Sequence, residues 1–395
     1  MQLSKRLQSL KPSATIAMSA KARELKSQGI DVISLSIGEP DFNTPDFIKE
    51  AAKKAIDENF SGYPPIAGYP ELKNAIIKKF KRDNNISYEA NQIVVSTGAK
   101  QSIYNVLQAI VDEGTEVIIP TPYWVSYSDI VELSGGTPVF VEGTLEADFK
   151  ITPAQLEAAI TDKTRAIIYS SPCNPSGSVY TENELKALAE VLAKYPNVII
   201  ISDEIYEHIV YGDKNVSIAS FPEVYNQTVT INGLAKAFAM TGWRIGYIGA
   251  PAWLAKACET LQGQVTSGAN SIAQRAAITA LEADPSSIKY MVDAFAERRE
   301  LMLGWAREIP SFVVNEPKGA FYLFPDVSAT FGKVYNGVQI NNADDLALYI
   351  LEHAQVAVVS GSAFGSKNCI RISYAASVEN LKEAMSRIKN ALIEK

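Results

Sequence analysis

The stretch IVVSTGAKQSIYNVLQAIVDEGTEVIIP, residues 93–120, decides the fold class. It opens with a short β-branched run, residues 93–96, and turns at Gly98 into a segment whose apolar side chains recur at helical spacing. A second β-branched run, residues 116–120, follows this helix. A strand, a covering helix and another strand form the unit from which parallel sheets are built. We therefore predict an α/β fold.

The same alternation continues along the chain. Further β-branched runs occupy residues 137–141, 165–170, 198–202, 228–232 and 243–248. Together with the first two they predict a seven-stranded, mostly parallel sheet with helices on both faces. Thr44-Pro45, Thr152-Pro153 and Thr181 with Glu184 are expected helix starts. Near the C-terminus, helices at 343–351 and 381–392 flank strands at 356–360 and 369–374, which indicates a smaller α/β unit.

Composition excludes several classes of protein. The net charge is -7, and no Lys/Arg-dense segment is present that would track a phosphate backbone, so we expect no nucleic-acid partner. Three widely spaced cysteines, Cys173, Cys258 and Cys369, suggest neither a disulfide framework nor a zinc site. Residues 1–15 hold no apolar stretch of signal-peptide length, and we expect no membrane span. We predict a cytoplasmic protein without a metal.

Polar residues gather where the predicted strands end, the edge at which open parallel sheets bind ligands. After the first strand a small-residue turn enters a helix and offers backbone N–H groups to an anion, although such turns are common without one. Asp203 follows an almost wholly apolar strand and needs a cationic partner if it is buried. Lys236 follows the next strand, and a polar, proline-rich stretch, residues 171–177, follows the strand at 165–170. A surface position remains open for Lys236, but four polar strand ends on one rim make a site the better interpretation.

Eight collinear strings resemble one family. They are SLSIGEPDFNTP (34–45), GYPPIAGYPELK (62–73), STGAKQ (96–101), PTPYWVSY (120–127), SPCNPSG (171–177), SDEIYEHIVY (202–211), NGLAKAFAMTGWRIGY (232–247) and CIRISYA (369–375). Together they resemble the fold-type I, class I pyridoxal-phosphate (PLP) aminotransferases, in the bacterial aspartate aminotransferase branch. The resemblance implies a large PLP-binding domain at 41–294, a small domain at 295–395, and an N-terminal arm at 1–40 that contributes to the small domain.

The resemblance also implies cofactor contacts. Lys236 is expected to form the Schiff base with PLP, and Arg244, eight residues later, to bind its phosphate. Asp203 is expected to contact the pyridine nitrogen and Tyr206 the ring hydroxyl. The remaining implied contacts are Gly98, Ala99 and Lys100 at the phosphate turn, Trp124 on the ring face, Asn174 at the ring hydroxyl, and Tyr63 reaching the phosphate of a neighbouring subunit. Tyr63 thereby implies a homodimer with shared sites.

Substrate contacts follow from the same resemblance. Arg371 is expected to fork the substrate α-carboxylate, beneath a loop containing Gly38 and beside Trp124 and Asn174. Thr15 and Lys100 match residues that accompany recognition of a distal carboxylate, which favours L-aspartate with 2-oxoglutarate. Prephenate or aromatic amination, and a carbon-sulfur lyase on the same fold, remain open alternatives. Gly233 and Ala235 replace the hydroxyl residues that some family members use near the phosphate.

Overall fold

The computed structural model describes residues 3–4, 7–8, 10 and 13–393. The expectation of no signal peptide in residues 1–15 therefore falls partly outside the described residues. Within them, no helix combines the length and the apolar character needed to cross a bilayer.

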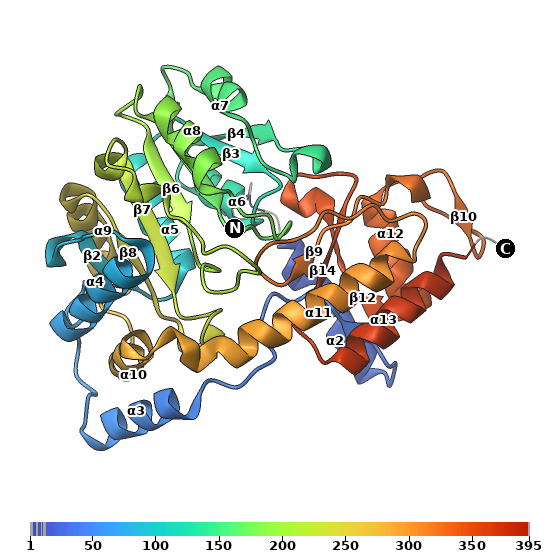
Figure 1. The fold of residues 1–395 in the computed structure, drawn as a ribbon, viewed down its shortest axis with the longest axis horizontal. Helices are drawn as coiled ribbons and strands as arrows, with labels where there is room; N and C mark the ends of the chain where they lie inside the picture. Colours follow the sequence, from blue (N-terminus) through green and yellow to red (C-terminus); the bar gives the residue numbers. More distant parts are fainter. Residues whose placement is uncertain (1–2, 5–6, 9, 11–12, 394–395) are drawn as a thin grey trace.

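A seven-stranded sheet forms the larger part of the molecule, in the order β2-β8-β7-β6-β5-β3-β4 (Figure 1). Its strands are β2 (Ile93–Ser96), β3 (Glu116–Thr121), β4 (Thr137–Glu142), β5 (Thr164–Ser170), β6 (Ile199–Asp203), β7 (Thr228–Gly233) and β8 (Gly246–Gly249). Only β8 runs antiparallel to the other six strands, so the predicted mostly parallel sheet is confirmed. The last strand begins at Gly246 and not at residue 243, because residues 241–243 form a 3₁₀ turn and Arg244 takes a left-handed conformation.

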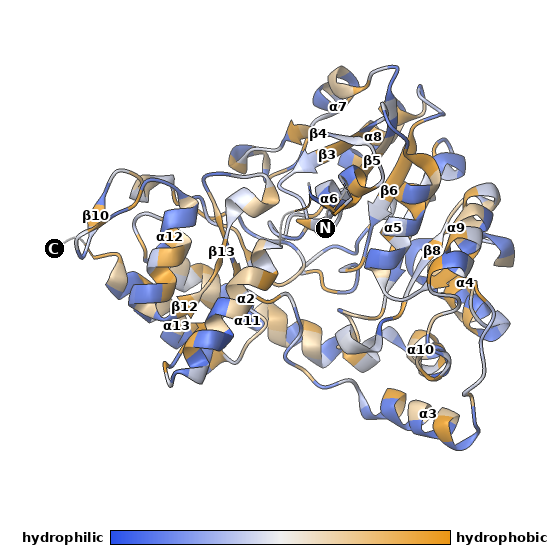
Figure 2. Cartoon of the chain, turned by 180° about the vertical axis from the view of Figure 1, so that it is seen from behind, coloured by the Kyte–Doolittle hydropathy of each residue, from blue (hydrophilic) through white to orange (hydrophobic). Residues whose placement is uncertain are grey.

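Helices cover both faces of this sheet. They are α4 (Pro70–Asn84), α5 (Ala99–Ile110), α6 (Ser126–Leu133), α7 (Pro153–Ala159), α8 (Glu182–Leu192) and α9 (Ala252–Val265). Outside them, α10 (Ser271–Glu282) packs on α4, and α3 (Asp46–Asp57) packs on α10. Strand side chains alternate between faces, so Ile199 and Ile201 pack with α5 and α9 while Ile200 packs with α8. Figure 2 shows these strands as largely hydrophobic and the covering helices as mixed.

The expected helix starts are mostly confirmed. Thr152 with Gln155 and Thr181 with Glu184 form capping boxes at α7 and α8. The prediction for Thr44 was wrong, because α3 starts at Asp46 and the Thr44 hydroxyl donates instead to the carbonyl of Ala239 at 2.7 Å.

A second unit combines both ends of the chain. It holds β9 (Tyr322–Leu323), β13 (Val359–Ser360) and β14 (Ile370–Ser373) in an antiparallel sheet ordered β13-β14-β9. The N-terminal β1 (Ile33–Ser34) pairs parallel with β12 (Val356–Ala357). The other elements are α2 (Ala14–Ser27), α11 (Lys289–Arg307), α12 (Ala343–Tyr349), the π-helix Ile350–Ala354, α13 (Val378–Ala391), and the hairpin of β10 (Val334–Tyr335) and β11 (Val338–Gln339). In Figure 1, α11 runs between the two units.

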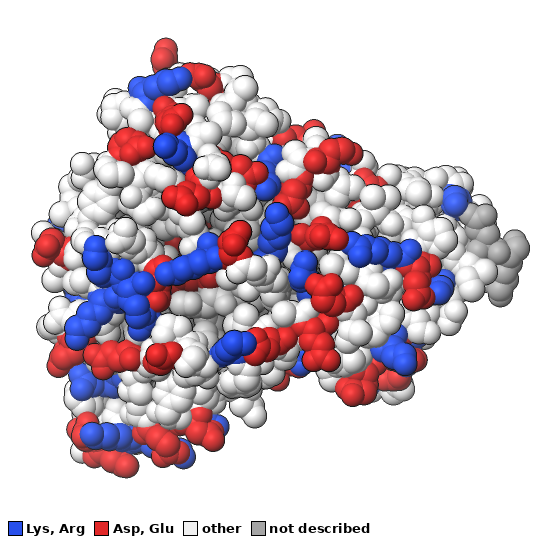
Figure 3. Space-filling view, in the orientation of Figure 1, with Lys and Arg blue, Asp and Glu red and all other residues white. Residues whose placement is uncertain are grey.

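The charged side chains are mixed in sign over the face drawn in Figure 3. Lys and Arg lie beside Asp and Glu across both units, and the sequence as a whole is acidic. This face therefore carries no extended field of a single sign.

Candidate functional site

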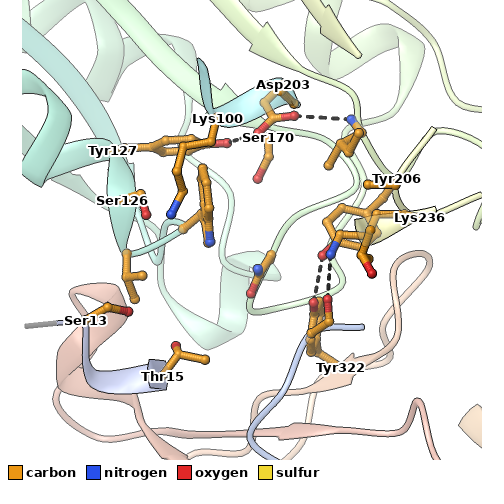
Figure 4. A pocket seen from close by; sticks show the side chains of 18 of the residues that line it. Ser13, Thr15, Lys100, Ser126, Tyr127, Ser170, Asp203, Tyr206, Lys236 and Tyr322 are labelled. Atoms are coloured by element: carbon orange, nitrogen blue, oxygen red, sulfur yellow. Dashed lines mark hydrogen bonds between the residues drawn. The ribbon is translucent and has the colours of Figure 1, made fainter. Parts of the chain in front are cut away.

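A cavity of about 350 Å³ lies beyond the carboxyl ends of β2, β3, β5, β6 and β7 (Figure 4). The small unit closes it with residues of β9 and β14, and the N-terminal segment contributes Ser13 and Gly38. The predicted site residues that line the cavity are Thr15, Gly38, Ala99, Lys100, Trp124, Asn174, Asp203, Tyr206, Lys236, Arg244 and Arg371. Parallel strands thus deliver polar side chains from distant parts of the sequence to one edge of the sheet.

Asp203 is a buried carboxylate at the last position of β6, only 4% exposed. The Tyr127 hydroxyl donates to Oδ2 at 2.6 Å and the backbone N–H of Ile205 donates to Oδ1 at 3.2 Å. Burial raises the pKa of Asp203 to about 6, although these hydrogen bonds and Lys236 oppose the rise. No Lys, Arg or His of the described chain makes an ion pair with it. This carboxylate is suited to a cationic nitrogen on a ligand.

Lys236 reaches the same cavity from the turn after β7. Its Nζ donates to the carbonyl of Gly38 at 2.5 Å and lies 5.8 Å from the centre of the Tyr206 ring. Burial lowers the pKa of Lys236 to about 8. Arg371 and Arg244 act in the same direction, whereas Glu39 and Asp203 oppose them. An amine with this pKa is available both as a nucleophile and as a proton acceptor near neutral pH.

The N-terminus of α5 forms a candidate anion site. Gly98 is the N-cap residue, with φ of 83°, and Ala99 opens the helix. A side chain at Gly98 would collide with the Arg244 guanidinium, and one at Gly246 would collide with the backbone of Ala99. The backbones of residues 98–99 and of Gly246, together with the Arg244 guanidinium, therefore meet closely around the first N–H groups of α5. Such an arrangement is typical of phosphate binding. Ala235 also lines the cavity but supplies no hydroxyl, as its sequence indicates.

Arg371 is buried, with 2% exposure, on β14. Its guanidinium donates to Asn174 Oδ1 at 2.9 Å and to the carbonyl of Ser36 at 2.6 Å. The Nε–H is buried and has no hydrogen-bond partner. A buried donor without an acceptor is costly, and a carboxylate bound beside this edge of the fork would satisfy it.

The opposite end of the cavity carries Lys100, Thr15 and Ser13 (Figure 4). The Lys100 Nζ lies 4.8 Å from the centre of the Trp124 ring, a cation–π contact. Burial and Arg244 lower the pKa of Lys100. A ligand with one carboxylate near Arg371 would meet a second cationic group at this end.

Two predicted residues lie outside the lining. Gly98 is the N-cap of α5 and shapes the candidate anion site without lining the cavity itself. Tyr63 is 97% exposed on the surface and does not line the cavity. The structure also adds Tyr127, which holds Asp203, and Tyr322, whose hydroxyl lies 2.7 Å from that of Tyr206. Tyr127 ends the string PTPYWVSY, which follows the predicted strand at 116–120, so the sequence could have indicated that it lies near the site. Tyr322 lies in an apolar run, residues 320–324, and this pattern predicts a core position and not a site residue.

One further cluster lies away from this cavity. Ligand atoms of Asp83, Glu207 and His208 all fall within 4.8 Å of one another. Lys79 contacts Glu207, and Arg82 donates to both oxygens of Asp83 at 2.7 and 2.9 Å. Despite burial, Lys79 and His208 lower the pKa of Glu207 to about 2. The carboxylates already have cations within the protein, so we assign the cluster to the fold and not to a metal.

Comparisons with known proteins agree with this geometry. The family model described as aminotransferase class I and II matches residues 30–388. The chain is 48% identical to an aspartate/prephenate aminotransferase of Nitrosomonas europaea, over 99% of this chain and 100% of that protein. It is 48% identical to an aspartate aminotransferase of Bacillus subtilis, over 98% of each. The crystal structure of an aspartate aminotransferase from Rhizobium meliloti superposes with a TM-score of 0.96 at 44% identity, covering 99% of this chain and 98% of that one. The chain belongs to the class I and II aminotransferase family.

Proposed function

We propose that the protein is a PLP-dependent aminotransferase that converts L-aspartate and 2-oxoglutarate into oxaloacetate and L-glutamate. One observation carries the proposal: a lysine of lowered pKa, a buried carboxylate without a cation and a buried arginine with a free donor meet in one cavity. Relatives named for aspartate as substrate support the choice of reaction.

The cavity fits PLP by the chemistry of its donors. Lys236 would hold the cofactor through its amine, and the α5 N-terminus with Arg244 would hold the phosphate. Asp203 would keep a proton on the ring nitrogen, because a buried carboxylate is stabilised by a neighbouring cation. Trp124, Asn174 and Tyr206 would contact the ring. Bound PLP supplies an electron-accepting ring for the charge left on the substrate α-carbon.

Lys236 has a second task once substrate is bound. Its Nζ would take the proton from the substrate α-carbon and later return a proton, acting as general base and then general acid. A pKa of about 8 keeps a usable fraction of the amine neutral near pH 7. The hydrogen bond to Gly38 at 2.5 Å keeps this nitrogen within the cavity.

Substrate choice rests on the two cationic ends of the cavity. Arg371 would fork the α-carboxylate beside Asn174, under the loop that contains Gly38. Lys100 and Thr15 would bind the distal carboxylate. Prephenate is the second candidate, because it too has two carboxylates and relatives are named aspartate/prephenate aminotransferase.

We propose three further properties of the whole protein. A homodimer would let Tyr63 reach the phosphate site of a neighbouring subunit, and its 97% exposure leaves it free to do so. The domains would be 1–40 with 295–395 as the small unit and 41–294 as the large one, a division supported by the pairing of β1 with β12. A cytoplasmic location is supported by three buried, free cysteines.

An absorbance scan of the PLP-loaded protein tests the function. We expect the visible band of the lysine-bound cofactor to fall rapidly with aspartate and to return on adding 2-oxoglutarate, while phenylalanine and glutamate rank the donors. Pyruvate released from a cysteine conjugate would indicate a lyase instead.

Lys236→Ala should abolish transamination, because it removes both the attachment point and the base. Activity is measured as oxaloacetate formation from aspartate and 2-oxoglutarate. Substantial turnover by this variant would refute the assignment of Lys236.

A further inference from the structure

Tyr322 is a fully buried tyrosine that reaches the cavity from the small unit. It lies on β9, opposite Ser373 of β14, with 0% exposure. Arg371 is two residues from Ser373 and so shares its side of the strand. The Arg371 guanidinium lies 4.7 Å from the centre of the Tyr322 ring and 4.8 Å from that of Phe364. Both rings therefore make cation–π contacts with the guanidinium, and Tyr322 is one of the two side chains that hold Arg371 in place.

The hydroxyl of the same side chain faces Tyr206, in the part of the cavity assigned to the cofactor. It lies 2.7 Å from the Tyr206 hydroxyl, and Figure 4 shows the two side chains meeting in the cavity. Tyr206 belongs to the segment after β6 of the large sheet, so this bond joins the two units. Neither hydroxyl makes another hydrogen bond to a described residue of the chain.

The direction of this bond affects what Tyr206 can do. Each hydroxyl has one proton to donate. If Tyr322 donates, Tyr206 keeps its own proton for a ligand, and accepting a hydrogen bond makes Tyr206 the stronger donor. The edge-to-face ring contact, with centroids 5.9 Å apart, limits the reorientation of either ring.

Gly38 adds a third link. A Cβ at this position would overlap the Tyr322 hydroxyl, so the loop can approach only because residue 38 is glycine. The Gly38 carbonyl in turn accepts from Lys236. The Tyr322 side chain thus contacts three groups with assigned roles: Tyr206, Arg371 and the Gly38 loop, whose carbonyl accepts a hydrogen bond from Lys236.

We propose that Tyr322 is a positioning residue that ties the carboxylate-binding end of the site to its cofactor end, by holding Arg371 against its ring and Tyr206 through its hydroxyl. This inference rests on the proposed aminotransferase function. Tyr322 lies in the small unit and Tyr206 in the large one. The hydrogen bond between them therefore makes the donor strength of Tyr206 depend on the relative position of the two units.

Tyr322→Phe tests the hydroxyl while leaving the ring beside Arg371. The readout is the pH titration of the visible absorbance band of the PLP-loaded protein. Tyr206 would donate to the negatively charged ring oxygen of the cofactor, which also accepts from the protonated nitrogen that joins the cofactor to Lys236. If Tyr206 donates more weakly, the oxygen keeps more negative charge and the proton on that nitrogen is held more tightly. We expect the titration midpoint to rise by roughly half a unit to one unit, and kcat/KM to fall about 3-fold to 10-fold.

Two controls separate positioning from general stability. Tyr349→Phe removes a buried hydroxyl that donates to the Ala391 carbonyl at 2.8 Å, outside the cavity lining, and should leave the midpoint unchanged. In a Tyr206→Phe background, adding Tyr322→Phe should move the midpoint no further, because the hydroxyl acts through Tyr206.

The outcomes distinguish this inference from the function on which it rests. A wild-type protein without the visible band would contradict the proposed function. A wild-type protein with the band, and a folded Tyr322→Phe variant that titrates at the wild-type midpoint, would overturn only the role of Tyr322. An additive shift in the double variant would overturn it as well.

Discussion

Two carboxylic acids, Asp203 and Glu204, stand side by side at the end of β6 and point into different surroundings. Asp203 faces the cavity, while Glu204, the residue after β6, does not line it and is buried with 1% exposure. Ser202 and Ser217 donate to Glu204 Oε1 at 2.9 and 2.6 Å, and its Oε2 has no partner. Burial, with Glu207 second, raises the pKa of Glu204 to about 8. At neutral pH this side chain therefore keeps its proton in the folded state.

That proton makes stability depend on pH. The unfolded chain loses it near the ordinary pKa of 4.5, whereas the folded protein keeps it until about 8. Between these values the folded state binds more protons, so the free energy of unfolding falls as pH rises, by up to about 1.4 kcal/mol per pH unit for one group. Glu204→Gln, which resembles the protonated acid, should flatten this fall. Urea unfolding at several pH values in the window measures the slope.

The matched control is Glu190→Gln, an exposed position on α8. It should leave the slope of the wild-type protein unchanged. Equal slopes for Glu204→Gln and the wild-type protein would mean that Glu204 is already ionised in the folded state.

At the scale of elements, the site depends on how closely β8 approaches the start of α5. Gly246 pairs with Ser96 of β2 and Gly233 of β7, and a Cβ there would overlap backbone atoms of Gly98 and Ala99. Gly246→Ala should therefore displace the α5 N-terminus, lower stability by about 1–3 kcal/mol and weaken PLP binding. Denaturant unfolding and cofactor titration measure both effects.

Gly304 offers the comparison within the same chain. It is exposed on α11, and a Cβ there meets no atom within 4 Å. Gly304→Ala should stabilise by about 0.5–1 kcal/mol, since alanine favours the helix, and should leave PLP affinity unchanged. If Gly246→Ala behaved like Gly304→Ala, the close approach would have no role at the phosphate site.

Elements differ in how far their sequence reveals them. Apolar runs located all seven strands of the large sheet, but such runs do not state strand direction, so the antiparallel course of β8 came only from the structure. Asp203 and Lys236 could be found because a charged residue at the end of an apolar strand, or in the turn that follows it, is unusual. Tyr322 could not, because its partner Tyr206 is 116 residues away and aromatic residues in an apolar run indicate core.

At the scale of the whole molecule, Tyr63 is the predicted site residue that the single chain leaves unexplained. It is 97% exposed, in a segment where Gly62, Tyr63 and Pro64 line a shallow surface pocket with Gly268 and Asn270. A tyrosine with nearly its whole surface in solvent buries no apolar area, and a second subunit would supply the missing contact.

Mixing two inactive variants tests whether sites are shared. Lys236→Ala damages the cavity of its own subunit, whereas Tyr63→Ala would damage that of the neighbour. A hybrid dimer then has one site with both defects and one intact site, so an equal mixture should recover about a quarter of wild-type activity if subunits exchange at random. Lys236→Ala with Asp203→Ala is the control, because both residues line one cavity and every hybrid site keeps a defect. Each variant is first assayed alone, and a fully active Tyr63→Ala variant would leave Tyr63 without a role at any site. If Tyr63→Ala alone is inactive, recovery in the first mixture but not in the control would place Tyr63 in the neighbour's site. No recovery in either mixture would mean that Tyr63 acts within its own subunit.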